Sequence, residues 1–384
     1  MENFSPELRL LLALLRSALG REEDAAQAPP ARPIDWPSFL ATVQRHRVGA
    51  FLRQRAPEEL VAQCPESVVA QFKTISATTT QRALAQAAEQ IRLVRCLEEA
   101  GIAAMPVKGL VLAQQLYGAI GLRHVGDIDL LIRPADVARA DAVLQGTGLR
   151  RTRPDFPLTA RQTAEYLRLK PEFEYLRAAP PHRIELLWRL EGLPETEAVW
   201  SRAVSCSLGG HAMRTLPPDF NALYLFQHGA RHGWFRLFWL VDVALLLRDA
   251  KFDWAATIVR ARELGLERVL LQGAALAHAL LGVEIPAALQ PLPRERGIVA
   301  ALVAEARRQI AREPAADEPA AEWLRQAFYR VRLKKGARAK FATMTPHLFS
   351  PLNWRTLPLP DRWFFLYYFA TPFLWIWRRA RRNA

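Results

Sequence analysis

Two aspartates one residue apart, Asp127 and Asp129, are the residues of this sequence whose chemistry is easiest to interpret. They lie in the stretch VGDIDLLI, whose alternation of acidic and aliphatic residues is typical of a β-strand. Side chains on a strand point to alternate faces, so both carboxylates are expected on one face. Two neighbouring carboxylates repel each other, and a divalent cation between them removes that repulsion. The pair therefore predicts a site for Mg²⁺, or for Mn²⁺ in its place.

A lysine and a glycine precede the aspartates at a predicted strand end. Lys108 and Gly109 follow a short apolar segment and open a segment with helical character. Glycine at this point would let backbone amides approach a phosphate closely, and a helix N-terminus favours negative charge. Lys108 would add positive charge beside a triphosphate. The alternative is an ordinary strand-to-helix turn without a ligand.

A single acid, Glu185, follows the aspartates in another predicted strand. If the two strands are neighbours in one sheet, Glu185 completes a cluster of three carboxylates. Such a cluster can hold two metal ions, one for the attacking oxygen and one for a leaving pyrophosphate. Alternatively, Glu185 pairs with Arg183 or Arg189, which share its face of the strand.

An Asp-x-Asp strand is compatible with three kinds of site. It can bind the metal of a nucleotidyltransferase, bind the metal of a glycosyltransferase that uses nucleotide sugars, or form a solvated acidic patch. A glycosyltransferase would carry a longer run of parallel βα units before the motif. The first hundred residues here are instead predicted to be helical, which favours the nucleotidyltransferase.

Two histidines lie four residues apart in a later helical segment. His228 and His232 therefore share one helix face, and Arg231 lies between them in sequence. The intervening Gly-Ala-Arg excludes the His-Glu-x-x-His zinc motif. The pair would bind the base, the phosphates or the acceptor of a transfer reaction, or would simply pack between helices, with Asp242 as a candidate neighbour. Arg231 and Arg123 are further candidate phosphate contacts.

The order of elements predicts an α+β protein, mainly α-helical, in four regions. Residues 1–100 are predicted to be helical, residues 101–194 to form a small mixed sheet with helices, and residues 195–312 to be helical again. Residues 313–384 comprise a linker and a basic aromatic tail, and another linker is expected at 25–33. Besides the Asp-x-Asp strand, the predicted strands are residues 102–107, 149–153, 172–178 and 183–189. The predicted helices beside and after the sheet include residues 110–117, 135–145, a segment within 217–249, 253–264, 267–281 and 297–312.

The net charge of +14 is concentrated in the tail. From residue 323 to the end, thirteen Lys or Arg residues stand against one acid, so the body is close to neutral. A nucleic-acid partner for the body is therefore not expected. Three cysteines without a Cys-x-x-Cys spacing, and an N-terminus without signal-peptide character, predict a cytoplasmic protein.

The tail combines aromatic and basic residues. Residues 363–377 are uncharged and contain nine aromatics, and four arginines follow between residues 378 and 382. Fifteen residues fall short of the roughly 20 that a membrane-spanning helix needs. Aromatics beside arginines suit the surface of an anionic membrane, so residues 363–382 are expected either at the inner face of the membrane or docked on the protein body.

The features around the aspartates resemble the DNA polymerase beta-like nucleotidyltransferase superfamily. More narrowly, the chain is similar to the bacterial uncharacterised nucleotidyltransferase family over roughly residues 35–290. The matching motifs are Lys108-Gly109, Tyr117, Arg123, GDIDLL at residues 126–131, HGARHGW at residues 228–234 and LVD at residues 240–242.

This resemblance implies transfer of a nucleoside monophosphate from an NTP such as ATP to an unidentified acceptor, with release of pyrophosphate. Asp127 and Asp129 would be the Mg²⁺ ligands, and Glu185 would be the third carboxylate and help to deprotonate the acceptor hydroxyl. Lys108, Gly109 and the basic and histidine residues above would bind the nucleotide. The acceptor would be a protein, a sugar or a small molecule.

Two positions depart from the superfamily pattern. Lys108-Gly109 stands where relatives usually have Gly-Gly or Gly-Ser, and Leu187 stands where they tend to have histidine. A catalytically degenerate protein that keeps the fold for binding or scaffolding is therefore the alternative from a different functional class.

Overall fold

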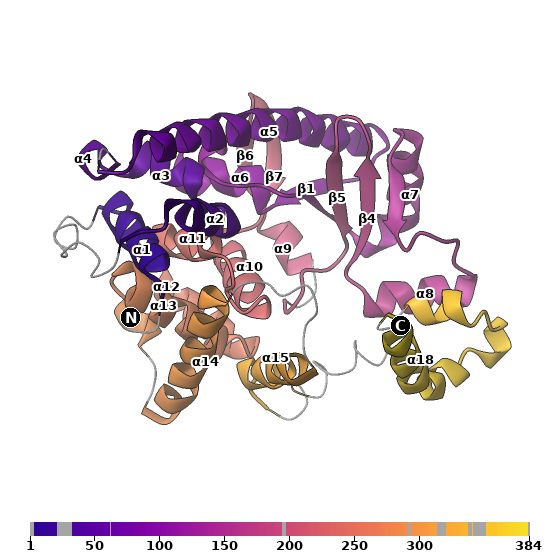
Figure 1. Cartoon of the computed structure of the whole chain (residues 1–384). Helices are drawn as coiled ribbons and strands as arrows, with labels where there is room; N and C mark the ends of the chain where they lie inside the picture. Colours follow the sequence, from indigo (N-terminus) through magenta and orange to yellow (C-terminus); the bar gives the residue numbers. More distant parts are fainter. Residues whose placement is uncertain are drawn as a thin grey trace.

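The chain combines many helices with two β-sheets (Figure 1). This computed structural model describes residues 4–20, 33–61, 63–193, 197–290, 293–312, 320–336, 340 and 351–382. The predicted α+β class, mainly helical, is confirmed. The predicted linkers lie outside the described residues, except for Pro33 at the end of the first.

A five-stranded sheet forms the centre of the fold. Its strands are β1 (Ala104–Val107), β2 (Ile128–Ile132), β3 (Arg150–Arg153), β4 (Glu172–Arg177) and β5 (His182–Leu187). They are arranged in the order β1-β2-β5-β4-β3. Strands β2 and β5 run parallel, and every other neighbouring pair is antiparallel. All four strands predicted besides the Asp-x-Asp strand are therefore present, with small differences at their ends.

One face of this sheet is covered by two helices. Helix α5 (Glu66–Glu99) runs along the upper side of the molecule in Figure 1 from the N-terminal helices to the sheet, and α7 (Val137–Gly146) lies beside the sheet. Ile128, Leu130 and Ile132 are buried in one hydrophobic cluster with side chains of both helices. Because side chains alternate along β2, Asp129 must face the opposite side of the sheet.

The N-terminal helices and the helices after the sheet share one hydrophobic core. The N-terminal group consists of α1 (Pro6–Ala18), α2 (Trp36–His46), α3 (Gly49–Arg55) and α4 (Glu58–Val61). The later group consists of α10 (Pro218–Arg231), α11 (Leu237–Leu247), α12 (Trp254–Glu263), α13 (Glu267–Leu281), α14 (Pro293–Ala311) and α15 (Ala320–Leu333). Two regions at opposite ends of the sequence are thus packed together next to the sheet.

Short elements connect these layers. They are α6 (Gly109–Leu112), the π-helix η2 (Ala113–Tyr117), the 3-10 turns η3 (Ile120–Leu122), η4 (Pro134–Asp136) and η5 (Ala287–Leu289), α8 (Ala160–Leu169) and α9 (Glu197–Ser201). Helix α8 and a hairpin of β6 (Val204–Leu208) and β7 (His211–Thr215) were not predicted. The β6 segment VSCSL alternates apolar and polar residues and so carried a strand signal, whereas the β7 segment HAMRT alternates less clearly.

The predicted segment 217–249 is divided into α10 and α11 by a tight turn. Gly233 and Trp234 adopt φ values of 62° and 58° there, which an uninterrupted helix does not allow. The Trp234 ring packs against Gly229, where an added Cβ would lie 2.2 Å from the ring. The first glycine of the HGARHGW motif, Gly229, therefore provides the space that this turn needs.

The described part of the tail contains α17 (Pro351–Thr356), η7 (Asp361–Trp363) and α18 (Leu366–Arg382). Phe364 and Tyr367 are buried in the cluster that covers the sheet. The Tyr367 hydroxyl donates to the carbonyl of Leu357 at 2.6 Å. Among the described residues, no helix is both long enough and apolar enough to cross a bilayer.

Candidate active site

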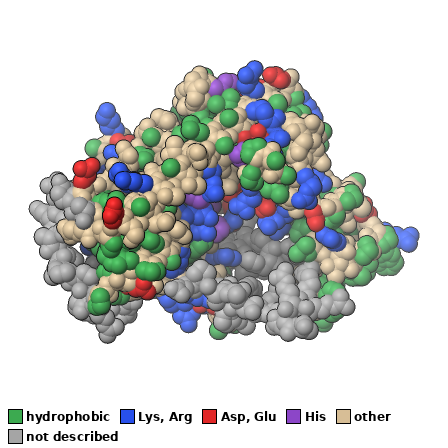
Figure 2. Space-filling model, turned by 45° about the horizontal axis from the view of Figure 1, so that its top comes forward, with side chains coloured by type: hydrophobic (Ala, Val, Ile, Leu, Met, Phe, Trp, Pro, Cys, Tyr) green, Lys and Arg blue, Asp and Glu red, His purple; other side chains and the backbone are tan. Residues whose placement is uncertain are grey.

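A cavity of about 610 Å³ opens on the face of the sheet opposite α5 and α7. Its walls come from the sheet, from α10 and α11, and from single residues of the N-terminal helices. Eight cations, five carboxylates and three histidines line it. The carboxylates are Asp127, Asp129, Glu172, Glu174 and Glu185, and the histidines are His124, His228 and His232. Figure 2 shows basic and histidine side chains gathered around a hollow near the centre of the molecule.

The register of the sheet brings the acids together. Asp129 is the direct partner of Glu185 in the parallel β2–β5 pair, and Glu185 is the direct partner of Glu174 in the antiparallel β4–β5 pair. Asp127 and Glu172 each lie two residues before an acid of this row and therefore share its face. The sequence prediction that Glu185 lies beside the aspartates is confirmed. Asp127 itself accepts a hydrogen bond from Arg183 at 2.9 Å.

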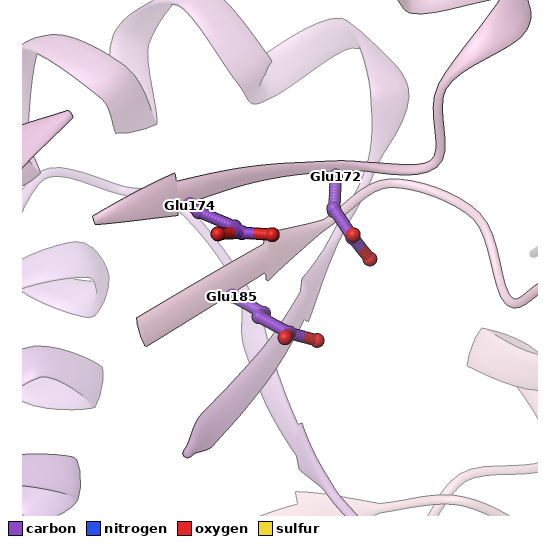
Figure 3. Close-up of side chains that lie close together, drawn as sticks. All are labelled: Glu172, Glu174 and Glu185. Atoms are coloured by element: carbon purple, nitrogen blue, oxygen red, sulfur yellow. The ribbon is translucent and has the colours of Figure 1, made fainter. Parts of the chain in front are cut away.

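Two of these acids were not singled out from the sequence. One oxygen each of Glu172, Glu174 and Glu185 lie within 4.8 Å of one another, a spacing that could hold a metal ion (Figure 3). Glu174 also forms an ion pair with Arg153, at 2.7 Å. The alternation in EFEY, residues 172–175, repeats the acid–apolar pattern of the Asp-x-Asp strand and was the available signal.

The acids occupy an environment that disfavours their full ionisation. Burial raises the pKa of Asp129 well above its usual value, and repulsion from Asp127 and Glu185 adds to this. Burial likewise raises the pKa of Glu185 and Glu172. Burial opposes ionisation of Asp127 too, but the charge of Lys108 and the hydrogen bond from Arg183 outweigh it, so the pKa of Asp127 is lowered. Such a group of acids becomes fully ionised most readily around a cation.

The residues present fit a divalent metal ion. Asp129 Oδ1 is buried and accepts no hydrogen bond from any described residue. The carboxylate oxygens that surround it are the hard donors that Mg²⁺ prefers. Lys108 Nζ lies 3.2 Å from the same oxygen as an ion pair, without the angles of a hydrogen bond.

Lys108 has an unusual backbone conformation at the end of β1. Its φ of 54° is rare for a residue with a side chain, and Gly109 follows with a φ of 47°. This turn directs the Lys108 ammonium inward, where it contacts Asp129 and lies 4.8 Å from the centre of the Tyr224 ring. The structure thus places Lys108 on the carboxylate side of the cavity, and Gly109 also lines the cavity.

Arg123 has a partner that the sequence did not indicate. Its Nε and Nη2 atoms each donate to one oxygen of Asp242 at 2.8 Å, and the Tyr117 hydroxyl donates to Asp242 at 2.6 Å. All three side chains are buried. Asp242 therefore holds η3 and η2 against α11. It contacts Arg123 and Tyr117, and not the histidine pair that the sequence suggested as its neighbour.

The histidines form an aromatic wall with a tryptophan. The rings of His228 and His232 are 4.8 Å apart, and His232 stacks on Trp239 with a centroid distance of 5.3 Å. Burial lowers the pKa of His228 well below its usual value and that of His232 to about 3. Both imidazoles are therefore neutral near neutral pH. Arg231, between them in sequence, forms an ion pair with Glu191 and also lines the cavity.

Three further arginines reach the cavity from outside the sheet. They are Arg47 at the end of α2, Arg82 on α5 and Arg236 just before α11. Burial and the charge of Arg236 lower the pKa of Arg47 to about 10. Nothing in the local sequence distinguishes these arginines from the many solvated ones, so only the fold reveals them.

The comparisons with known proteins agree with the geometry of the site. The model of a family described as uncharacterised nucleotidyltransferase matches residues 32–282, which is more than half of the chain. The match runs from just before α2 to the end of α13 and so includes every residue that lines the cavity. No curated protein matches the chain. No solved structure matches it either.

Proposed function

The chain belongs to the uncharacterised nucleotidyltransferase family, and from this premise we propose that it moves a nucleoside monophosphate from an NTP to an acceptor. The reaction would depend on Mg²⁺ and release pyrophosphate. The observation that carries the proposal is the pairing of Asp129 with Glu185 across two parallel strands, with Asp127 on the same face.

In this proposal the three acids hold the metal. Asp127, Asp129 and Glu185 supply carboxylate oxygens on one face of the sheet. When bound, Mg²⁺ would neutralise the charge that develops on the transferred phosphoryl group and on the leaving pyrophosphate. Lys108 would keep the charge of Asp129 balanced between turnovers and would contact the phosphates when the substrate is present.

Glu185 would also accept the proton of the acceptor. An acceptor hydroxyl oxygen forms a bond to the α-phosphorus, and the bond from that phosphorus to the bridging oxygen breaks, so pyrophosphate leaves. The hydroxyl proton passes to a Glu185 carboxylate oxygen.

The aromatic wall is the proposed site of the nucleobase. His228, His232 and Trp239 offer ring faces beside the cavity, and the low pKa of both imidazoles keeps this wall uncharged. Bases stack on such surfaces with little dependence on their identity, so more than one NTP would be accepted.

A catalytically degenerate protein is the second candidate, and one observation favours it. Both aspartates already have a cation partner within the chain, because Lys108 lies against Asp129 and Arg183 against Asp127. Those ion pairs would stabilise the fold without a metal. A scaffold of this kind would bind nucleotide without consuming it.

Labelled nucleotides separate these candidates. The full chain would be incubated with a cell extract, Mg²⁺ or Mn²⁺, and each NTP labelled at either the α- or the γ-phosphate. A nucleotidyltransferase transfers the α label and not the γ label to an acceptor, whereas a phosphoryl transferase does the reverse. No transfer of either label, together with binding of NTP, would support the scaffold.

We also propose that the tail contacts an anionic membrane surface from the cytoplasmic side. Three aromatic side chains spaced four residues apart on the tail, Phe365, Phe369 and Phe373, are exposed, the last two by more than 70%. Phe369 and Phe373 share one face of α18, and Phe365 lies directly before this helix. The arginines at its end would attract acidic lipid headgroups. The buried Phe364 and Tyr367 anchor the opposite face to the protein body.

A further inference from the structure

Three guanidinium groups of the cavity have no anionic partner. Arg47, Arg82 and Arg236 form no side-chain hydrogen bond or ion pair with any residue that the structure describes, and the Nε of Arg236 is buried in addition. The remaining cations of the cavity are paired. These pairs are Lys108 with Asp129, Arg123 with Asp242, Arg153 with Glu174, Arg183 with Asp127 and Arg231 with Glu191.

Aromatic rings hold two of these arginines in place. Arg47 lies over the Phe238 ring at 5.9 Å, and Arg236 lies over the Phe235 ring at 4.7 Å. Both rings belong to the segment that leads into and begins α11. The charges of Arg236 and Arg82 repel that of Arg47, and the carboxylate that opposes this repulsion, Asp127, is already bonded to Arg183. The arrangement is therefore most stable when a further anion enters between the arginines.

The position of Arg47 relates the unpaired arginines to the aspartate motif. Gly126 directly precedes the aspartate motif. A Cβ added to this glycine would lie 3.5 Å from the Nη1 atom of Arg47. Arg123, which follows the Lys108–Gly109 segment in the chain, lies over the same Phe238 ring as Arg47. Arg47 therefore lies at the Asp127 end of the carboxylate row, and the charges of Arg236 and Arg82 act on it there. Glu174, which is paired with Arg153, lies at the other end of the row.

We propose that Arg47, Arg82 and Arg236 bind the β- and γ-phosphates of the donor nucleotide. This inference rests on the proposed function. It assigns a substrate-binding role to Arg82 on α5 and to Arg47, the residue directly after α2. Guanidinium groups suit this role, because each can donate two parallel hydrogen bonds to a phosphate and remains charged. The polyphosphate would neutralise the three arginines, as acids of the chain already neutralise the other cations of the cavity.

Binding of inorganic pyrophosphate tests this proposal without requiring catalysis. Titration calorimetry of the full chain would be done in the presence of EDTA, so that no metal links pyrophosphate to the acids. We expect Arg47→Gln and Arg236→Gln each to weaken binding by about ten-fold or more, the usual effect of losing a charge-assisted hydrogen bond. Arg82→Gln should weaken it less, because Arg82 is exposed.

Controls make the outcome specific. Arg95→Gln, an exposed arginine further along α5, should leave pyrophosphate affinity unchanged. Arg47→Lys should recover part of the affinity, because it retains the charge but not the fork of donors. Orthophosphate should bind more weakly than pyrophosphate. Thermal unfolding of each variant would confirm that it is folded.

Two results would overturn the inference. One is a wild-type chain that does not bind pyrophosphate, and the other is an Arg47→Gln/Arg236→Gln chain that binds it as tightly as wild type. Either result would leave the proposed function standing if α label is still transferred. Conversely, arginine-dependent binding without any label transfer would preserve the inference and remove the proposed reaction.

Discussion

Asp129 on β2 and Glu185 on β5 are direct partners across two parallel strands. Parallel neighbours require a crossover, and here the chain passes through α7, β3, α8 and β4 before it returns as β5. The two carboxylates are therefore distant in sequence and adjacent in space. Their position on the face opposite α5 and α7 gives them access to the cavity, whereas Ile128 and Leu130 on the other face are in the core.

The buried Arg123–Asp242 pair should be important for stability. Asp242→Asn would leave the Arg123 guanidinium charged and without its ionic partner in the core. We expect a loss of about 3–5 kcal/mol of unfolding free energy, which is usual when one member of a buried pair is removed. Chemical denaturation would measure it. The double variant Arg123→Met/Asp242→Leu should be less destabilised than Asp242→Asn, and equal destabilisation would contradict this account.

The tight packing of Trp234 on Gly229 predicts an unusually sensitive glycine. Gly229→Ala places a Cβ inside the tryptophan ring, so α10 or the ring must shift. We expect a loss of roughly 1–3 kcal/mol, in the range for overpacked cores. Gly146→Ala is the matched control, since a Cβ there meets nothing within 4 Å and the residue lies in α7. Similar unfolding midpoints for the two variants would contradict the close packing of Trp234 against Gly229.

Buried histidines make stability depend on pH. His46 Nδ1 accepts a hydrogen bond from the Leu237 amide at 3.2 Å, and burial, with Arg45 and Arg236 nearby, lowers its pKa to about 3. Because His46 in the unfolded chain binds a proton with the ordinary histidine pKa of 6.5, stability is lost as the pH falls from there toward 3. His46 thereby lowers the free energy of unfolding by about 1.4 kcal/mol for each pH unit of acidification, or by roughly 2 kcal/mol between pH 6.5 and 5.

Replacing that histidine should flatten the dependence. His46→Asn keeps an acceptor in the position of Nδ1 but cannot titrate, so stability between pH 6.5 and 5 should fall less steeply than in wild type. Denaturation curves at each pH would give both slopes, and identical slopes for His46→Asn and wild type would rule out this role of His46.

The exposed aromatics of the tail should govern binding to membranes. Phe369→Ser/Phe373→Ser removes apolar surface without touching the buried anchors Phe364 and Tyr367. We expect at least a ten-fold weaker affinity for vesicles that contain acidic lipid, since each buried phenylalanine contributes roughly 1.5–3 kcal/mol. Leu84→Ser, at an exposed position on α5, is the control. Sedimentation with vesicles measures binding, and equal binding by wild type and the double variant would exclude the membrane contact.

The sequence predicted most of the sheet and its acidic face because both depend on local alternation. Asp127, Asp129 and Glu185 stand in short acid–apolar repeats that identify strands. Their adjacency rests on strand order, which a single sequence does not specify but which the family resemblance implied. The sequence did not reveal Arg47 or Arg82, because an arginine on a helix has the same local pattern whether it faces solvent or a cavity.

The partners within the site were the least predictable part. Lys108 turns toward Asp129 through a positive φ, and no propensity of lysine predicts that conformation. Arg123 donates to Asp242 only because η3 and α11 lie next to each other in the folded chain. Glu172 and Glu174 did carry a readable signal. They lie on β4, the antiparallel neighbour of β5, and repeat the acid–apolar alternation of the Asp-x-Asp strand.

Transfer of label from α-labelled NTP by acid variants tests the carboxylate centre most directly. Asp129→Asn and Glu185→Gln keep the size of each side chain and remove its charge, so transfer should fall by about 10²-fold or more, as for loss of a catalytic acid–base group. Asp136→Asn, at an exposed ion pair outside the cavity, should transfer label like wild type. Wild-type rates in both Asp129→Asn and Glu185→Gln would contradict the account.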